Sequence, residues 1–218
     1  MLQIFLAEFI ATFTLIFIGA GSVLAGGGLV AIALAHGFAI LVMVYTVGHI
    51  SGAHMNPAVT IALWARKKLA GDLIALYIGA QLGGAIIAAF ALRMLAPAAF
   101  IASLGGTPML SAQTSFLQGM VIEAVLTFLL VFVVFTITAE KHSAKNLSGI
   151  VIGLVIAMNI LFGGPFTGAA MNPARALGPA VASGAWSGHL LWWLGPILGA
   201  LGGAFLYAYF EKKKGFFS

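Results

Sequence analysis

The sequence contains one short polar motif twice, each time within an apolar stretch. Asparagine is a preferred N-cap residue and proline favours the first helical position, so each Asn-Pro-Ala copy predicts the start of a helix. A side-chain amide donates and accepts hydrogen bonds, and a helix N-terminus carries about half a positive charge. The chemistry expected at these motifs is therefore hydrogen bonding and electrostatics. The two copies comprise Asn56, Pro57, Ala58, Asn172, Pro173 and Ala174.

The helices that begin at these motifs are predicted to be short. Apolar sequence continues only over 56–64 in the first copy and over 172–182 in the second. A helix that crosses a bilayer needs about 20 apolar residues, so each copy predicts a half-span. Two short segments interrupted by glycine and proline, at matching places in two halves of a membrane protein, indicate a central site where the half-helix N-termini meet.

The composition predicts that the elements around these motifs lie in a membrane. Of the 218 residues, 62% are hydrophobic and 7% are charged, and the mean hydropathy is +1.13. Soluble domains carry about 25% charged residues. The chain has no cysteine, which excludes disulfides and cysteine metal sites. The first six residues show no basic region or cleavage site, so we interpret them as part of the first span.

Six longer apolar stretches predict complete membrane spans. The expected fold class is therefore an all-α membrane protein with six transmembrane helices plus two re-entrant half-helices. The six stretches are 4–24, 29–47, 73–95, 116–138, 147–162 and 188–210.

The net charge of +5 comes from basic residues that mark one side of the membrane and do not predict a nucleic-acid partner. The loops 25–28 and 96–115 contain no charged residue. By the positive-inside rule both termini are cytoplasmic, and we expect a multi-pass protein of the plasma or inner membrane. Arg93, near the outer end of the third span, is expected to snorkel to the interface. The basic clusters are Arg66, Lys67 and Lys68; Lys141 and Lys145; and Lys212, Lys213 and Lys214.

The two halves of the chain share one order of parts. Glu8 and Glu123 are 115 residues apart, and Asn56 and Asn172 are 116 apart. We therefore expect a first repeat at 1–109 and a second at 110–218, each with three spans and a half-span. Since three spans are an odd number, the second repeat must be inverted relative to the first. The repeat favours a structural role for both glutamates, as acceptors of backbone N–H groups in the re-entrant loops; the other interpretation is that they are transport carboxylates.

The sequence resembles the aquaporin, or major intrinsic protein, family through motifs that lie in order along nearly the whole chain. The resemblance implies a homotetramer in the bilayer with one pore per subunit, and water as a permeating species. No cofactor or metal is expected, nor an enzyme, since nothing resembles a nucleophile with a base. The motifs are Ala7-Glu8-Phe9, the segment 48–60, Met171-Asn172-Pro173-Ala174-Arg175 and Trp193-Leu194-Gly195-Pro196.

Non-helical backbone at membrane depth must be buried in protein or line a wet cavity. We therefore expect 48–55 and 163–171 to present carbonyl oxygens along one wall of a pore. At its centre, Asn56 and Asn172 would donate to a water molecule, which then cannot easily relay a proton, while the two helix N-termini repel cations.

The resemblance also implies an outer constriction that contains Arg175. Its other members, carried over by distance from the two asparagines, are His36, Ile160 and Ala169. Strict water channels have phenylalanine and histidine at the positions of His36 and Ile160. The set found here is similar to that of tonoplast intrinsic proteins, which also admit ammonia or urea. The constriction is thus predicted to accept small neutral solutes besides water.

Glycerol facilitators typically have aspartate after the filter arginine and a proline in the last span followed by an aliphatic residue. This chain has Ala176 after Arg175, and Trp192-Trp193 in the last span. In both respects it resembles the aquaporins and not the glycerol facilitators. A broad facilitator of glycerol, urea and ammonia, with water secondary, is the alternative. Two further hypotheses are an alternating-access carrier and a scaffold with a vestigial pore.

The remaining histidines are assigned from their positions. His49 and His54 are expected to brace the first re-entrant loop and are not spaced for a metal site. His142 and His189 lie in loops or at the interface and have no evident task.

Overall fold

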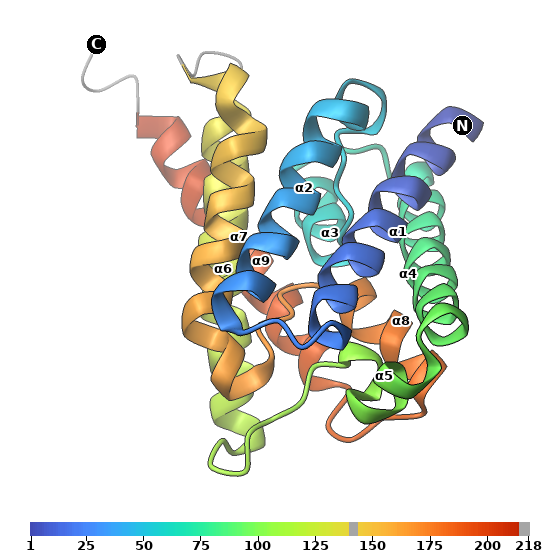
Figure 1. Cartoon of the computed structure of the whole chain (residues 1–218). Helices are drawn as coiled ribbons and strands as arrows, with labels where there is room; N and C mark the ends of the chain where they lie inside the picture. Colours follow the sequence, from blue (N-terminus) through green and yellow to red (C-terminus); the bar gives the residue numbers. More distant parts are fainter. Residues whose placement is uncertain (140–143, 214–218) are drawn as a thin grey trace.

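The computed structural model describes residues 1–139 and 144–213, which form a bundle of helices without a strand in either range (Figure 1). Six long helices have the length and hydropathy to cross a membrane. The predicted fold class is confirmed. These helices are α1 (Leu2–Leu24), α2 (Leu29–Ser51), α4 (Ile74–Leu95), α6 (Phe116–Ile137), α7 (Ser148–Thr167) and α9 (Leu191–Lys213).

Two shorter helices, α3 (Pro57–Ala65) and α8 (Pro173–Ser183), lie inside the bundle. In Figure 1, α3 lies toward the end of the bundle that holds the N-terminus, and α8 lies toward the opposite end. The other short elements are α5 (Pro97–Ala102) and the 3-10 turns η1 (Gly71–Leu73), η2 (Leu104–Gly106) and η3 (Lys145–Leu147).

Two spans are longer than the sequence predicts. The helix α2 continues to Ser51 and α7 continues through Pro165 to Thr167, so the non-helical segments are 52–55 and 168–171, not 48–55 and 163–171. Both helices end where a glycine takes the left-handed conformation, at Gly52 (φ 86°) and Gly168 (φ 77°). Glycine adopts this conformation without steric cost and commonly terminates helices. The earlier glycines do not interrupt the helices.

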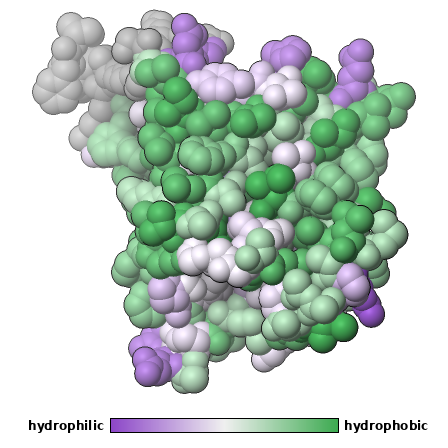
Figure 2. All heavy atoms as spheres, viewed as in Figure 1, coloured by the Kyte–Doolittle hydropathy of each residue, from purple (hydrophilic) through white to green (hydrophobic). Residues whose placement is uncertain are grey.

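The surface of the bundle is apolar along its middle. Figure 2 shows hydrophobic residues over most of one face, with hydrophilic residues gathered toward its two ends. Of the basic residues used to orient the chain, Lys141 and Lys214 lie outside the described residues, as does His142, and the side chain of Lys213 is not described. The pattern is that of a multi-pass integral membrane protein.

The helix pairs α1/α4 and α6/α9 pack through equivalent glycines. A Cβ on Gly84 of α4 would collide with the carbonyl of Phe9, and one on Gly199 of α9 would collide with the carbonyl of Ala124. Gly84 and Gly199 are 115 residues apart, and so are Phe9 and Ala124. Small residues allow helix backbones to approach closely in a membrane. These contacts bring the two glutamate-bearing helices against the rest of the bundle.

Candidate functional site

Each Asn-Pro-Ala motif forms the helix start that its sequence predicts. Asn56 has an extended backbone, and its Oδ1 accepts a hydrogen bond from the N–H of Ala58 at 2.9 Å. Asn172 does the same toward Ala174 at 2.9 Å and toward Arg175 at 3.3 Å. A proline follows each cap at the first helical position. The caps satisfy N–H groups that would otherwise point unpaired from the helix ends.

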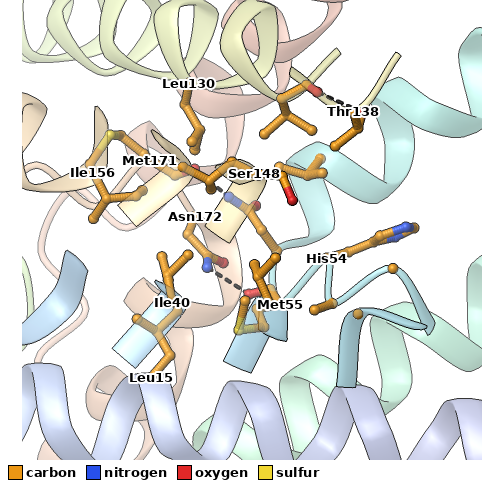
Figure 3. A pocket seen from close by; sticks show the side chains of 18 of the residues that line it. Leu15, Ile40, His54, Met55, Leu130, Thr138, Ser148, Ile156, Met171 and Asn172 are labelled. Carbon is orange, nitrogen blue, oxygen red and sulfur yellow. Dashed lines mark hydrogen bonds between the residues drawn. The ribbon is translucent and has the colours of Figure 1, made fainter. Parts of the chain in front are cut away.

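The two half-helices are joined by a crossed pair of hydrogen bonds. The Nδ2 of Asn56 donates to the carbonyl of Met171 at 2.8 Å, and the Nδ2 of Asn172 donates to the carbonyl of Met55 at 2.7 Å (Figure 3). Both asparagines are buried and line the same cavity. Each amide nitrogen carries a second N–H, so each side chain retains one donor after the crossed bond is made.

The residues before each asparagine are held in an unfavourable backbone conformation. Met55 and Met171 have φ angles of 52° and 53°, and Ala53 and Ala169 have 49° and 44°. For residues other than glycine the left-handed conformation costs about 1–2 kcal/mol each. Such strain persists only where the surroundings hold it.

The first re-entrant loop is held by Glu8. Its carboxylate accepts backbone N–H bonds from His54 and Met55, both at 2.8 Å. It also accepts from the Ser51 hydroxyl at 2.6 Å and from the Gln81 amide at 2.8 Å. All four donors converge on a side chain that is fully buried in α1.

Glu123 makes the matching contacts in the second loop. It accepts N–H bonds from Ala170 at 2.9 Å and Met171 at 2.7 Å, and the Thr167 hydroxyl donates to it at 2.7 Å. Each loop is thus held by two backbone N–H bonds and one hydroxyl bond to its glutamate, and the bond from Gln81 to Glu8 has no counterpart among the described contacts of Glu123. The geometry fits the structural interpretation of both carboxylates.

Two aromatic side chains complete these loop supports, a role that the sequence analysis assigned to neither of them. The hydroxyl of Tyr77 donates to the carbonyl of Ser51 at 2.6 Å, and the indole N–H of Trp192 donates to the carbonyl of Thr167 at 3.1 Å. Tyr77 and Trp192 are 115 residues apart, like the two glutamates. That offset is the signal that could have found them.

The histidines of the first half differ in their contacts. His54 stacks on Tyr77 with ring centroids 4.6 Å apart, and its Nδ1 lies 3.1 Å from the Thr60 hydroxyl. His49 lines the cavity from the last turn of α2 and is exposed; within the described chain its ring makes no hydrogen bond to the loop. His189, before α9, accepts from the indole of Trp193 at 3.2 Å, and burial lowers its pKa.

The four residues predicted to form the constriction line one cavity. His36, Ile160, Ala169 and Arg175 are each buried and each line the same cavity. Arg175 donates from Nη1 to the carbonyl of Gly106 at 2.8 Å. This contact, which the sequence did not predict, joins the loop after α5 to the start of α8.

His36 is fixed at one ring nitrogen and unpaired at the other. Its Nδ1 lies 2.9 Å from the carbonyl of Ile32. Because a carbonyl can only accept, Nδ1 must carry the hydrogen of this bond. The opposite ring atom, Nε2, is buried and has no hydrogen-bond partner among the described residues.

The cavity has a volume of about 580 Å³ and connects these groups. Besides the asparagines and the constriction residues, its walls include backbone of the first loop and apolar side chains such as Leu15, Ile40 and Ile156 (Figure 3). It also reaches Lys145, Asn146 and Ser148, in η3 and at the start of α7. The wall is thus partly polar backbone and partly apolar side chain.

Arg93 is exposed near the end of α4 and makes a contact that the sequence did not predict. Its Nη1 donates to the carbonyl of Ala182 in the last turn of α8, at 2.6 Å. The last carbonyls of a helix lack partners within the helix, and a cation near them is favourable. Arg93 therefore caps the end of α8 opposite to Asn172.

Six apolar helices around two half-helices that meet at their N-termini define a membrane channel protein of the aquaporin type. The model of the family described as major intrinsic protein matches residues 1–207. The chain belongs to the major intrinsic protein family.

Curated relatives agree with this assignment. The chain is 42% identical to "Aquaporin TIP4-4" of Zea mays over 208 residues, covering 89% of this chain and 81% of that protein. It is 38% identical to "Probable aquaporin NIP4-2" of Arabidopsis thaliana, covering 94% and 73%. Among solved structures it is similar to the aquaglyceroporin from Plasmodium falciparum, with a TM-score of 0.83, 26% identity, and coverage of 97% of this chain and 96% of that one.

Proposed function

We propose that the chain is a passive water channel that excludes protons and ions and whose constriction also admits small neutral solutes such as ammonia and urea. The observation that carries the proposal is the crossed pair of bonds from Asn56 and Asn172, which aims two helix N-termini at one point of a single cavity. Both asparagines are the N-caps of helices that begin with Asn-Pro-Ala, and the relatives of this chain are named aquaporins.

Exclusion of protons follows from the donors at this point. One N–H of each asparagine is committed to a methionine carbonyl, and the other is left for the lumen. A water molecule that accepts from both asparagines has its own hydrogens directed away along the pore, so it cannot complete a proton relay. The partial positive charges of α3 and α8, together with Arg175, oppose the entry of cations.

A solute range beyond water is supported by the composition of the constriction. Ile160 contributes an apolar wall and Ala169 only a methyl group, while His36 and Arg175 are the polar members. Compared with a set that has phenylalanine at position 36 and histidine at position 160, this set replaces the polar wall at position 160 by an apolar one, and Ala169 adds no bulk. Ammonia and urea are the neutral solutes that we propose for it.

A second candidate is a broad facilitator that also conducts glycerol. The similarity to an aquaglyceroporin structure over 97% of the chain favours it. Against it stand Ala176 and Trp192, which occupy positions where glycerol facilitators typically differ. We therefore propose glycerol as a minor permeant at most.

We further propose that the chain is an inverted repeat with halves at 1–109 and 110–218 and that it assembles as a homotetramer. The equivalent supports of Glu8 and Glu123 support the repeat. Both termini are proposed to be cytoplasmic, because Arg66, Lys67 and Lys68 follow α3 at the end that holds the N-terminus. Relatives of the tonoplast type make an intracellular membrane a second location besides the cell membrane.

The test is stopped-flow light scattering on proteoliposomes that contain the purified chain, with protein-free liposomes as the control. An impermeant osmolyte measures water, and urea, methylamine (an ammonia analogue) and glycerol each measure solute entry through re-swelling. A pH-sensitive dye under a potassium diffusion potential measures proton leak. Water permeability equal to that of protein-free liposomes would overturn the proposal, and saturable flux that depends on an ion gradient would indicate a carrier instead.

A further inference from the structure

The imidazole of His36 lies in a niche that exists because residue 19 has no side chain. A Cβ built on Gly19 of α1 would lie 2.5 Å from both Cδ2 and Nε2 of His36 and 2.9 Å from Cε1. Distances below 3.0 Å are essentially never found for real Cβ atoms. The outer edge of the ring therefore occupies the space that any other residue at position 19 would fill.

The ring is held in this niche from one side only. Its Nδ1 donates to Ile32 one turn earlier in α2, whereas Nε2 faces α1 without a hydrogen-bond partner among the described residues. A buried nitrogen without a partner is unfavourable, and it would regain one if the ring moved toward a wet lumen. The niche thus lets the ring lie close to α1, and among the described residues no hydrogen bond at Nε2 holds it there.

We propose that Gly19 is a specificity-determining positioning residue, which widens the constriction by letting His36 recede toward α1. This inference rests on the proposed function only in taking His36 as part of the constriction. A side chain at position 19 would push the ring away from α1 and toward the cavity that His36 lines. To reach an ordinary contact of 3.4 Å from 2.5 Å the ring must move by about 0.9 Å. The aperture would narrow by a similar amount.

The fold should tolerate this change because the neighbour that must move is the end of a side chain and not backbone. Gly84 differs in this respect, because a Cβ there would meet the backbone of Phe9. A matched control lies two residues away. A Cβ at Gly21, in the same helix, would meet only Leu92 Cδ2 at 3.4 Å, which is ordinary contact.

The first test is a double-mutant cycle measured by stopped flow on proteoliposomes with equal protein content. We expect Gly19→Ala to lower urea permeability by about tenfold and water permeability by about twofold or less, and Gly21→Ala to change neither. In a His36→Ala background no ring occupies the niche, so Gly19→Ala should have no further effect. An equal loss of urea permeability in both backgrounds, or no loss in either, would overturn the proposal.

The second test does not depend on permeation. Solid-state ¹⁵N NMR of histidine-labelled protein in bilayers reports ring hydrogens, and the His36 signal is identified by its absence in His36→Phe. We expect a hydrogen on Nδ1 in the wild type, a shifted His36 signal in Gly19→Ala, and an unchanged one in Gly21→Ala. An unchanged His36 signal in Gly19→Ala would refute the niche. If the wild type proved impermeable to water, the proposed function would fail, while this measurement would still decide the position of the ring.

Discussion

Replacement of Glu123 by glutamine tests whether the buried carboxylates are structural or transport groups. One oxygen of Glu123 accepts from Thr167 and Ala170, and among the described residues the other accepts only from Met171. In Glu123→Gln the amide NH2 is best placed where the second oxygen lies. There it faces the N–H of Met171, and two donors cannot form a hydrogen bond. One bond to a charged acceptor, worth about 1.5–3 kcal/mol, is then lost, and the two that remain become neutral and weaker.

The loss is partly offset, because glutamine does not carry the desolvation cost of a buried charge. We therefore expect the free energy of unfolding to fall by about 2–3 kcal/mol. For a chain of this size 1 kcal/mol corresponds to about 2–4 °C, so the midpoint of thermal unfolding should fall by roughly 4–12 °C.

The assay is thermal unfolding in detergent followed by tryptophan fluorescence, with hydrogen exchange as the local readout. Exchange should rise in 168–172, because Met171 is strained and loses the bond that holds its N–H. Glu211→Gln is the matched control: this side chain is 44% exposed and lies 3.9 Å from Arg66, so its pair contributes little.

The result that would refute the structural role is a Glu123→Gln protein with an unchanged unfolding midpoint and no permeation. That combination would mean that the carboxylate acts on the permeating species. Reduced stability with passive, non-saturable water flux would instead support the channel interpretation.

Three further substitutions test the constriction and the helix that carries it. Arg175→Ala should raise cation leak by about 100-fold, because a unit charge about 5 Å from a permeating cation contributes about 3 kcal/mol at an effective dielectric constant of 20. Water flux should change little, and loss of water flux in vesicles that contain the folded variant would contradict this. His36→Phe should narrow the range of conducted solutes, so urea and methylamine entry should fall relative to water, and an unchanged ratio would remove His36 from the constriction. Arg93→Met should lower the free energy of unfolding by about 1 kcal/mol through loss of the bond to Ala182, with Arg93→Lys retaining part of it, and thermal unfolding of the two variants checks the difference.

The sequence predicts the architecture well because hydropathy and the asparagine caps act locally. The apolar residues of each span predict that span, and the Asn-Pro pair predicts the start of each half-helix. The ends of α2 and α7 were predicted four or five residues too early, because glycines at 48 and 163 resemble helix ends. In the structure a Cβ at Gly163 would collide with Leu126, so this glycine serves close packing within a continuing helix.

The contacts that local patterns do not predict join residues far apart in the chain. The carbonyl of Gly106 that meets Arg175 comes from a loop with no charge or motif, and Asn159, buried in α7, donates to the carbonyl of Leu126 and the sulfur of Met171. A backbone carbonyl has no sequence signature, so its partner emerges only when the fold is known. The niche at Gly19 could not be predicted from the sequence either, because only the fold shows that the His36 ring occupies the space beside this glycine.

The two halves repeat the supports of the centre but not the polar groups around them. Glutamate, hydroxyl and aromatic supports recur at offsets of 115 or 116 in both loops. By the same offsets, however, His54 and Gln81 correspond to Ala170 and Pro196. Arg175 likewise corresponds to Val59.

This division separates two physical tasks. The centre must present donors from both sides, so its supports have to be equivalent in the two halves. Selection by size and polarity needs only one narrow point, and the polar residues that line it can differ between the halves without disturbing the centre. In the passive pore that we propose, this asymmetry cannot drive net transport, because such a pore moves a neutral solute only down its gradient. We infer that substitutions at His36, Ile160, Ala169 and Gly19 alter which solutes pass, whereas substitutions at the repeated supports alter whether the pore forms at all.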